Sequence, residues 1–471
     1  MKKIHHIIKG KLMLGAAILA GAALFVSCEK FLDVQPTNAL VADNPISDER
    51  SAQAAVIAVY TELKTFQSYV ELFGTMPGDN VEFVGSLTQF VELDNLAFSV
   101  TNPAIVPAYR SGYTLINRAN WVIVEVPKVP TTYDFPEATK NHILGEAYFL
   151  RAFAYFNLGR TWGGVQLQLT PTTDLKSVGN LKRSTLADTY TRVKDDLTEA
   201  ERLLKEEDAT TRDRAQKSSV RALRARVHLY AGEWAEAEQY ASQVIANTAK
   251  FELVQPYGEF FKGPFLTKES VFEVNFTSTI SILTYGAGNW WKWTPSAVKS
   301  GGSFEYRPTN EIIGLLNDAG KVGNRNALLK NSSAGTYVGL YHTTDATADV
   351  PANTDPFYAI RLAELYLIRA EARAKKTPTD LPGAIADLNV IRARAGVPDF
   401  ATTTDAQTVI RAIEEERRIE FAFEGHRWYD LVRTGRAVEV LGVGENYQRF
   451  PLPIADVLSD EGLDGENNPG Y

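Results

Sequence analysis

Cysteine is nearly absent from the 471-residue sequence, which contains Cys28 alone. A single cysteine cannot form an intramolecular disulfide, so the fold does not depend on a disulfide framework. The motifs HExxH, GxSxG and the Walker loop are also missing, and the six histidines are scattered. These absences argue against several common enzyme classes. They leave a glycosidase open, because glycosidase carboxylates have no fixed spacing in sequence.

Long apolar runs are scarce as well, and the longest, "LMLGAAILAGAALFV", covers only the 15 residues 12–26. Because a membrane-crossing helix needs about 20 apolar residues, this run after a lysine-rich start predicts a signal peptide. Residues 1–27 resemble a bacterial lipoprotein signal, with Cys28 as the lipidated first residue of the mature chain. Phe25 occupies the place where leucine is usual, so an ordinary secretory signal with an incidental cysteine is the alternative. Several acyl chains on Cys28 would give stable attachment to membrane lipid.

The charge balance is acidic, with 49 basic and 57 acidic residues and a net charge of −8. Removal of residues 1–27 takes away four basic residues and no acidic ones, which changes the net charge to −12. An acidic chain is a poor partner for nucleic acid or anionic lipid. With 45% apolar residues it can still bury a large core, so we expect a soluble body on a lipid tether at residues 28–46.

Residues 47–471 are expected to form a single domain that is mostly helical. Beyond the helix that starts near Ser47 and Asp48, helical periodicity covers Tyr109–Val126, Pro136–Arg160, Thr185–Leu204, Ser218–Ala231 and Glu233–Ala246. The last two segments look like a tetratricopeptide hairpin, with Gly232 at the turn and small or bulky packing residues at Ala225, Trp234, Ala237 and Ala241.

A second pair of helices follows at residues 361–374 and 384–396, with packing residues Ala372, Ala384, Leu388 and Ile391. We expect hairpins mainly in 47–250 and 357–437 to stack across a loop-rich insertion, 251–356, in which "ESVFEVNFTS" alternates like a strand. An irregular helical domain is the alternative. The tail, 438–471, is rich in Pro, Gly and Asn and is expected to be extended.

Four segments stand in a characteristic order: "CEKFLDVQP" after the signal, "GEAYFLRAFAYFNLGRTWGGVQL", "IEEERRIEFAFEGHRWYDLVRTGRA" and the terminal "PLPIADV…NNPGY". Together they resemble the SusD/RagB family of outer-membrane nutrient-binding lipoproteins of Bacteroidetes. The resemblance implies a mostly α, SusD-like fold, in which four tetratricopeptide-like helical hairpins support an irregular ligand-binding half with a few short strands. It further implies a surface-exposed lipoprotein that gives its ligand to a TonB-dependent, SusC-like transporter. No cofactor is expected, and calcium is left open.

The segment "EEERRIEFAFEGHRWYDLVR" contains candidate catalytic or metal-binding residues. Glu416, Glu420 and Glu424 share one helix face, and His426 and Asp430 are four residues apart. Catalytic carboxylates must face each other across a cleft, which one helix face does not provide. The same segment contains arginines that could pair with these acids: Arg417, Arg418, Arg427 and Arg433. The sequence therefore favours a partly buried ion-pair network over catalysis or metal binding.

The stretch "YGAGNWWKWTPSAVKSGG" is the best candidate for ligand binding, because Trp290, Trp291 and Trp293 cluster between glycines. In an extended backbone Trp291 and Trp293 would face one way and Trp290 the other. Aromatic rings suit the faces of sugar rings, while Asn289 and Lys292 could bond hydroxyl groups. The alternative is that one or more of the rings anchor the segment in the core.

An earlier stretch, "FQSYVELFGTMPGDNVEF", offers further ligand contacts just after the first helix: Tyr69, Phe73, Asp79 and Asn80. Asp79 and Asn80 could equally cap a turn. The leading interpretation is a non-catalytic oligosaccharide-binding protein. The alternatives are a peptide-binding member of the same family, a lipid-anchored protein-interaction scaffold and a surface hydrolase.

Overall fold

Long α-helices dominate the described part of the chain, which comprises residues 46–173, 181–205, 211–262, 266–275, 290–339, 356–463 and 465–471. In this computed structural model they are α2 (Glu49–Thr75), α4 (Ile105–Glu125), α5 (Glu137–Trp162), α6 (Leu186–Leu203), α7 (Lys217–Ala231), α8 (Trp234–Ile245), α12 (Leu362–Lys375), α13 (Leu381–Ala395) and α14 (Ala406–Glu420). The predicted helical segments are therefore confirmed within a few residues at each end. The first helix begins as expected, because the Asp48 carboxylate accepts a hydrogen bond from Ser51 N at 2.8 Å.

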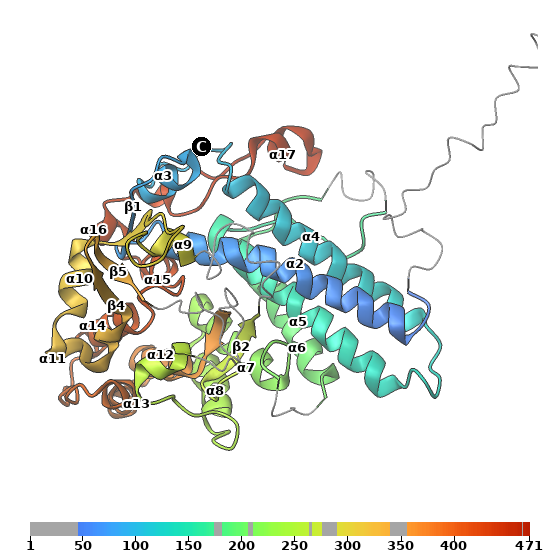
Figure 1. Cartoon of the computed structure of the whole chain (residues 1–471). Helices are drawn as coiled ribbons and strands as arrows, with labels where there is room; N and C mark the ends of the chain where they lie inside the picture. Colours follow the sequence, from blue (N-terminus) through green and yellow to red (C-terminus); the bar gives the residue numbers. More distant parts are fainter. Residues whose placement is uncertain are drawn as a thin grey trace, which may run out of the picture. The chain divides into compact units, whose positions relative to one another are not determined.

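These helices pack in pairs that follow the order of the chain (Figure 1). The pairs are α2 with α4, α5 with α6, α7 with α8, and α12 with α13, and neighbouring pairs are joined through α4–α5, α6–α7 and α8–α12 contacts. Gly232 turns the chain between α7 and α8 in the left-handed region, at φ 74°, where a side chain is unfavourable. The contact of α8 with α12 confirms that the hairpins stack across the long insertion.

Helix α5 lies at the centre of this stack and is buried over most of its C-terminal four turns. Its last residue, Trp162, donates from Nε1 to Pro451 O at 3.0 Å. The Trp162 ring also packs edge-on against Phe73 of α2, with centroids 5.9 Å apart, and against Phe450, at 6.2 Å. The "TWGG" end of α5 thus attaches the C-terminal tail to the helical stack.

Short elements make up the loop-rich part of the molecule, and most of them are seen at the left of Figure 1. The described strands form three antiparallel pairs: β1 (Val81–Phe83) with β3 (Tyr306–Pro308), β2 (Ser270–Val274) with β6 (Phe357–Arg361), and β4 (Leu329–Ser332) with β5 (Gly335–Val338). Short helices accompany them: α3 (Thr88–Asp94), α9 (Trp290–Trp293), α10 (Asn310–Leu316), α11 (Ala319–Val322), α15 (Arg427–Arg433) and α16 (Ala437–Leu441). The predicted strand in "ESVFEVNFTS" is confirmed as β2.

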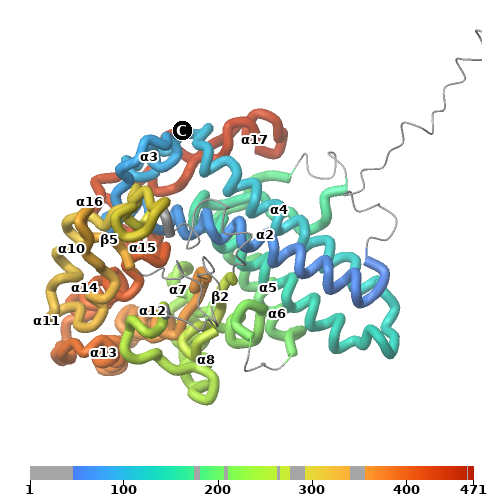
Figure 2. The backbone as a smooth tube through the Cα atoms, in the orientation of Figure 1, coloured from blue at the N-terminus to red at the C-terminus, as the bar shows by residue number. Residues whose placement is uncertain are grey.

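The C-terminal tail returns to α4, as the red segment of Figure 2 shows, and it is not wholly extended. It contains α17 (Ile454–Ser459), so the expectation of a tail without helix is wrong there. Pro453 precedes the helix, where its missing N–H is not needed, and the six residues that follow contain no proline or glycine. Asn468 then attaches the end of the chain, since its Nδ2 donates to Trp162 O at 2.9 Å and to Phe450 O at 2.6 Å.

Residues 46–471 pack as one unit. Among the described residues, none of the helices combines the length and the apolar character that a membrane span requires. Cys28 and the proposed signal peptide lie outside the described residues.

Candidate functional site

The β1–β3 pair brings the two stretches that we expected to bind ligand next to each other. β1 follows Asp79 and Asn80, β3 follows the Trp-rich stretch, and Val81 lies opposite Pro308. Thr309 closes the junction, because its N–H donates to Asn80 O at 3.1 Å and its Oγ1 donates to Asp79 O at 2.8 Å. Two segments more than 200 residues apart therefore share one surface, here called the loop face, which comprises β1, α3, α9 and β3.

Tyr69 and Phe73 do not reach this surface. Helix α2 continues to Thr75, so both residues lie within the helix rather than after it, and they are 8% and 1% exposed. The Phe73 ring lies 4.7 Å from that of Phe450 in the core. Their burial argues against a ligand role and corrects the expectation that they lie in a loop.

Asp79 and Asn80 are held by arginines of the C-terminal segments. The Asp79 carboxylate accepts from Arg427 at 2.6 and 2.8 Å and lies 2.9 Å from Arg418 Nη2. Burial alone would raise the pKa of Asp79, but these two arginines outweigh it and lower the pKa. Asn80, 1% exposed, donates to Ala422 O at 2.9 Å and accepts from Arg418 Nε at 3.0 Å. Both side chains thus serve the junction, which argues against ligand contact.

Trp293 packs into the core, as the alternative interpretation of the Trp cluster allowed. It is 6% exposed, and its ring packs against Tyr306, at 5.3 Å, and Phe423, at 6.0 Å. The backbone at Trp290–Trp293 is a short helix, α9, so the alternation that an extended backbone would give does not apply.

Of the residues beside Trp293 that we expected to bind ligand, only the side chain of Lys292 is described. Lys292 is buried and pairs with Glu305, so it is engaged within the protein. Asn289 lies outside the described residues, as do the side chains of Trp290 and Trp291. The ligand-binding roles of Asn289, Trp290 and Trp291 therefore stay predictions.

The acidic stripe of α14 belongs to a buried ion-pair network. Glu420 lies 2.6 Å from Arg361 and 3.2 Å from Arg325, and it also pairs with Arg394. Arg325 lies 2.5 Å from Glu416, and Arg361 lies 2.8 Å from Glu424. Burial alone would raise the pKa of Glu420, but the surrounding arginines lower it to about 2. The predicted ion-pair network is confirmed.

His426 and Asp430 also have structural roles. Asp430 lies between Arg417, at 2.9 Å, and Arg433, at 2.8 Å. Burial lowers the pKa of His426 to about 3, and its ring stacks on Phe421 with centroids 4.6 Å apart. Within the described residues there is no group of three or more His, Cys, Asp or Glu side chains that could hold a metal ion.

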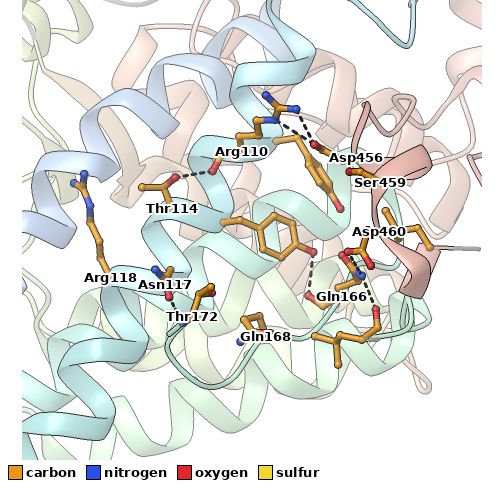
Figure 3. Close-up of a pocket in the computed structure, with 14 residues that line it drawn as sticks. Arg110, Thr114, Asn117, Arg118, Gln166, Gln168, Thr172, Asp456, Ser459 and Asp460 are labelled. Atoms are coloured by element: carbon orange, nitrogen blue, oxygen red, sulfur yellow. Dashed lines mark hydrogen bonds and ion pairs between the residues drawn. The ribbon is translucent and has the colours of Figure 1, made fainter. Parts of the chain in front are cut away.

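An open cavity of about 500 Å³ lies between α4, α17 and the segment 166–172 (Figure 3). The rings of Tyr109 and Tyr113, with centroids 5.0 Å apart, line it together with Leu181 and Leu463. Burial raises the pKa of Tyr109 to about 12, so its hydroxyl is neutral at physiological pH. We refer to this feature as the α4–α17 cavity.

Hydrogen bonds across the α4–α17 cavity connect its walls. Arg110 of α4 forms a two-point contact with Asp456 of α17, at 2.7 and 3.3 Å (Figure 3). Gln166 donates to Asp460 at 2.9 Å, and its carbonyl oxygen accepts from Tyr113 at 3.0 Å. These contacts fix the relative positions of α4, α17 and the segment between them.

This cavity was not predicted from the sequence. Its only signal was a polar stripe on α4, Arg110, Thr114 and Arg118, spaced at four residues. Such a stripe usually marks a solvent-exposed helix face. The opposite wall comes from residues more than 300 positions away, which no local pattern reveals.

Comparison with known proteins agrees with the architecture of paired helices and loops. Residues 268–471 match the family described as "SusD family", and residues 30–229 match "Starch-binding associating with outer membrane". A solved laminarin-binding SusD-like protein aligns with a TM-score of 0.75 at 24% identity, covering 90% of this chain and all of that one. A SusD superfamily structure from Bacteroides thetaiotaomicron gives a TM-score of 0.76 at 22% identity, with 90% of this chain covered and all of that one.

Sequence relatives cover nearly the same range. SusD-like protein P38 of Formosa agariphila is 28% identical, over 90% of this chain and 92% of the relative. The starch-binding protein SusD of Bacteroides thetaiotaomicron is 30% identical over 143 residues, which is 28% of this chain and 23% of the relative. The molecule is thus a mostly α protein of stacked helical pairs with a loop-rich half. It belongs to the SusD/RagB family.

Proposed function

We propose that this protein is a surface lipoprotein that binds an oligosaccharide and delivers it to a TonB-dependent outer-membrane transporter. The observation that carries the proposal is the match of both halves of the chain to the SusD family, among whose members are proteins named for starch and laminarin binding. A binding role without catalysis is supported by the engagement of Glu416, Glu420 and Glu424 in buried ion pairs.

The loop face is the proposed capture surface. Val84 and Leu87, which follow β1, are 45% and 44% exposed, so apolar groups are already presented there. Trp290 and Trp291 lie in the same region of the chain as Trp293, whose burial in the core fixes α9 beside β3. We propose that the rings of Trp290 and Trp291 cover the faces of sugar rings. Asn289 would lie beside them to bond hydroxyl groups.

Aromatic stacking is expected to contribute much of the binding free energy, because neutral sugars offer no charge for the protein to bind. Each sugar hydroxyl exchanges a hydrogen bond with water for one with protein, a net gain of only about 1 kcal/mol. Stacking of an aromatic ring on a nucleic-acid base, a rough analogue, contributes about 1–3 kcal/mol. Loss of one ligand-facing tryptophan should therefore weaken binding roughly tenfold or more.

Calorimetry with maltohexaose and laminarihexaose tests this proposal on the parent, Trp290→Ala and Trp291→Ala. We expect the parent to bind one of these glycans and at least one variant to bind it roughly tenfold more weakly. Tyr133→Ala is the control, because this ring is 98% exposed and lies outside the loop face. Equal affinity in both tryptophan variants and the parent would move the site away from Trp290 and Trp291.

A further inference from the structure

The α4–α17 cavity shares no residue with the loop face. Its lining comes from α4, the segment 166–172, Leu181, α17 and Leu463, whereas the loop face comprises β1, α3, α9 and β3. The cavity therefore requires an explanation of its own. Its volume of about 500 Å³ lies within the range of about 300–1,000 Å³ that is usual for small-molecule sites.

We propose that the α4–α17 cavity is a second saccharide-binding site, specific for a short stretch of neutral sugar. The inference rests on the proposed function for the class of ligand, and on the geometry of the cavity for the location. It assigns to α4 and α17 a binding role separate from that of the loop face.

The charges of the cavity favour a neutral ligand. The charged lining residues are two arginines and two aspartates, Arg110, Arg118, Asp456 and Asp460. Arg110 pairs with Asp456 across the cavity at 2.7 Å, and Arg118 lies 3.2 Å from Glu62 outside it. Asp460 already accepts hydrogen bonds from Gln166 and from Gly462 N. With two positive and two negative side chains in its lining, the cavity gives no net attraction to an anion or a cation.

Several uncharged groups remain available for a polyhydroxylated ligand. Asn117 accepts from Thr172 N at 2.8 Å through Oδ1, while none of the described residues accepts a hydrogen bond from its Nδ2. Gln168 donates through Nε2 to Thr170 O, which leaves Oε1 as an acceptor, and the Ser459 hydroxyl has no partner among the described residues. Amide donors, amide acceptors and hydroxyls match the alternating donors and acceptors of sugars.

The tyrosine rings in the wall of the cavity offer apolar contact to a sugar ring. Tyr113 is only partly buried although its hydroxyl is bonded to Gln166 O, so a part of the ring is open to the cavity. Because the hydroxyl is fixed, the ring is held in one orientation before a ligand arrives. A pre-positioned ring loses little conformational entropy on binding. The Tyr113 ring is thus suited to stack on one sugar face.

The test uses the full chain in mild detergent and calorimetry with maltotriose and laminaritriose. We expect two sites per molecule for the trisaccharide that binds. Asn117→Asp keeps an acceptor for Thr172 N, but it replaces the Nδ2 donor by an oxygen and adds a negative charge, so it should weaken one of the two sites at least about five- to tenfold. Ser459→Trp should block that site, whereas Leu458→Trp is the matched control, because Leu458 is 76% exposed and does not line the cavity.

The outcomes separate this inference from the proposed function. A single site that is lost in Trp290→Ala or Trp291→Ala but unchanged in Asn117→Asp and Ser459→Trp overturns the second site and retains the loop face. A single site that is lost in Ser459→Trp supports the cavity and overturns the loop face. Absence of binding for both the trisaccharides and the hexasaccharides overturns both. Thermal melts of each variant identify any loss of binding that comes from unfolding.

Discussion

Arg361 forms ion pairs with three buried carboxylates that come from different parts of the chain. Its guanidinium contacts Glu420, Glu269 and Glu424 at 2.6 to 2.8 Å, and its side chain is 2% exposed. Because Arg361 ends β6 and Glu420 ends α14, these bonds connect the strand pair β2–β6 to the C-terminal helices. A planar group with several donors suits this position, and a lysine could not replace it.

Replacement of Arg361 by methionine should destabilise the protein by about 3–5 kcal/mol, because it leaves buried carboxylates without their partner. Urea denaturation of the parent and Arg361→Met at pH 7 measures the difference. Lys321→Met is the control, since the Lys321–Glu415 pair is 52% and 49% exposed and such pairs contribute about 0–1 kcal/mol.

The difference between the parent and Arg361→Met should also depend on pH. The folded-state pKa of Glu420 is lowered from 4.5 to about 2, so its stabilising contribution is complete above the unfolded value and is lost as the pH falls toward 2. The difference should therefore shrink below about pH 4.5. A difference that stays constant from pH 7 to pH 3 would contradict an ionic origin.

Local sequence predicted that the acids of α14 are paired, but not which arginines pair with them. Four arginines of the same segment seemed sufficient, yet Glu420 pairs with Arg325, Arg361 and Arg394 from other elements. Only Asp430 pairs with the local Arg417 and Arg433. Partners that meet through folding over long sequence distances leave no local pattern.

Among the elements, α2 makes a close backbone approach to the turn that precedes α15. A Cβ atom added at Gly74 would lie 1.8 Å from Gly425 O, so only glycine allows this approach. Gly425 itself has a φ of 69° and lies against Glu71 of α2. The glycine pair therefore sets the distance between the first long helix and the C-terminal segments.

Gly74→Ala should destabilise the protein by about 1–3 kcal/mol, because the backbone of Gly425 cannot move aside as a side chain would. The change in urea midpoint measures it. Gly314→Ala is the matched control in α10, where an added Cβ meets nothing within 4 Å. There the better helix propensity of alanine should stabilise by up to about 1 kcal/mol. Equal effects of the two substitutions would refute the close approach.

The helices were predictable because their apolar periodicity and caps are local, as Asp48 and Gly232 illustrate. The Trp-rich stretch was not, because its glycines and lack of periodicity suggested an extended loop, whereas tertiary contacts of Trp293 with Tyr306 and Phe423 stabilise a short helix. Helix α17 was missed for a related reason. The proline and asparagine residues around it obscured six residues that are compatible with a helix.

For the whole molecule, the proposed function requires that the folded unit stay close to its transporter. Residues 46–471 contain no helix in their described ranges that could span a membrane. In the proposed function the attachment is made by Cys28, which lies 18 residues before the first described residue, Ile46. A lipid anchor on a short tether confines the protein to the membrane surface and so raises its effective concentration near a partner in that membrane.

We accordingly predict that Cys28→Ala abolishes incorporation of labelled fatty acid and releases the protein from the outer-membrane fraction. Ser27→Ala, which keeps the cysteine, should behave like the parent. Gentle detergent extraction and pull-down of the parent should recover a much larger TonB-dependent barrel protein, and Cys28→Ala should recover far less of it. Labelled fatty acid in Cys28→Ala would refute the anchor. Repeated recovery of the parent alone would instead refute a stable complex and leave the anchor intact, because acylation and transporter binding are separate interactions.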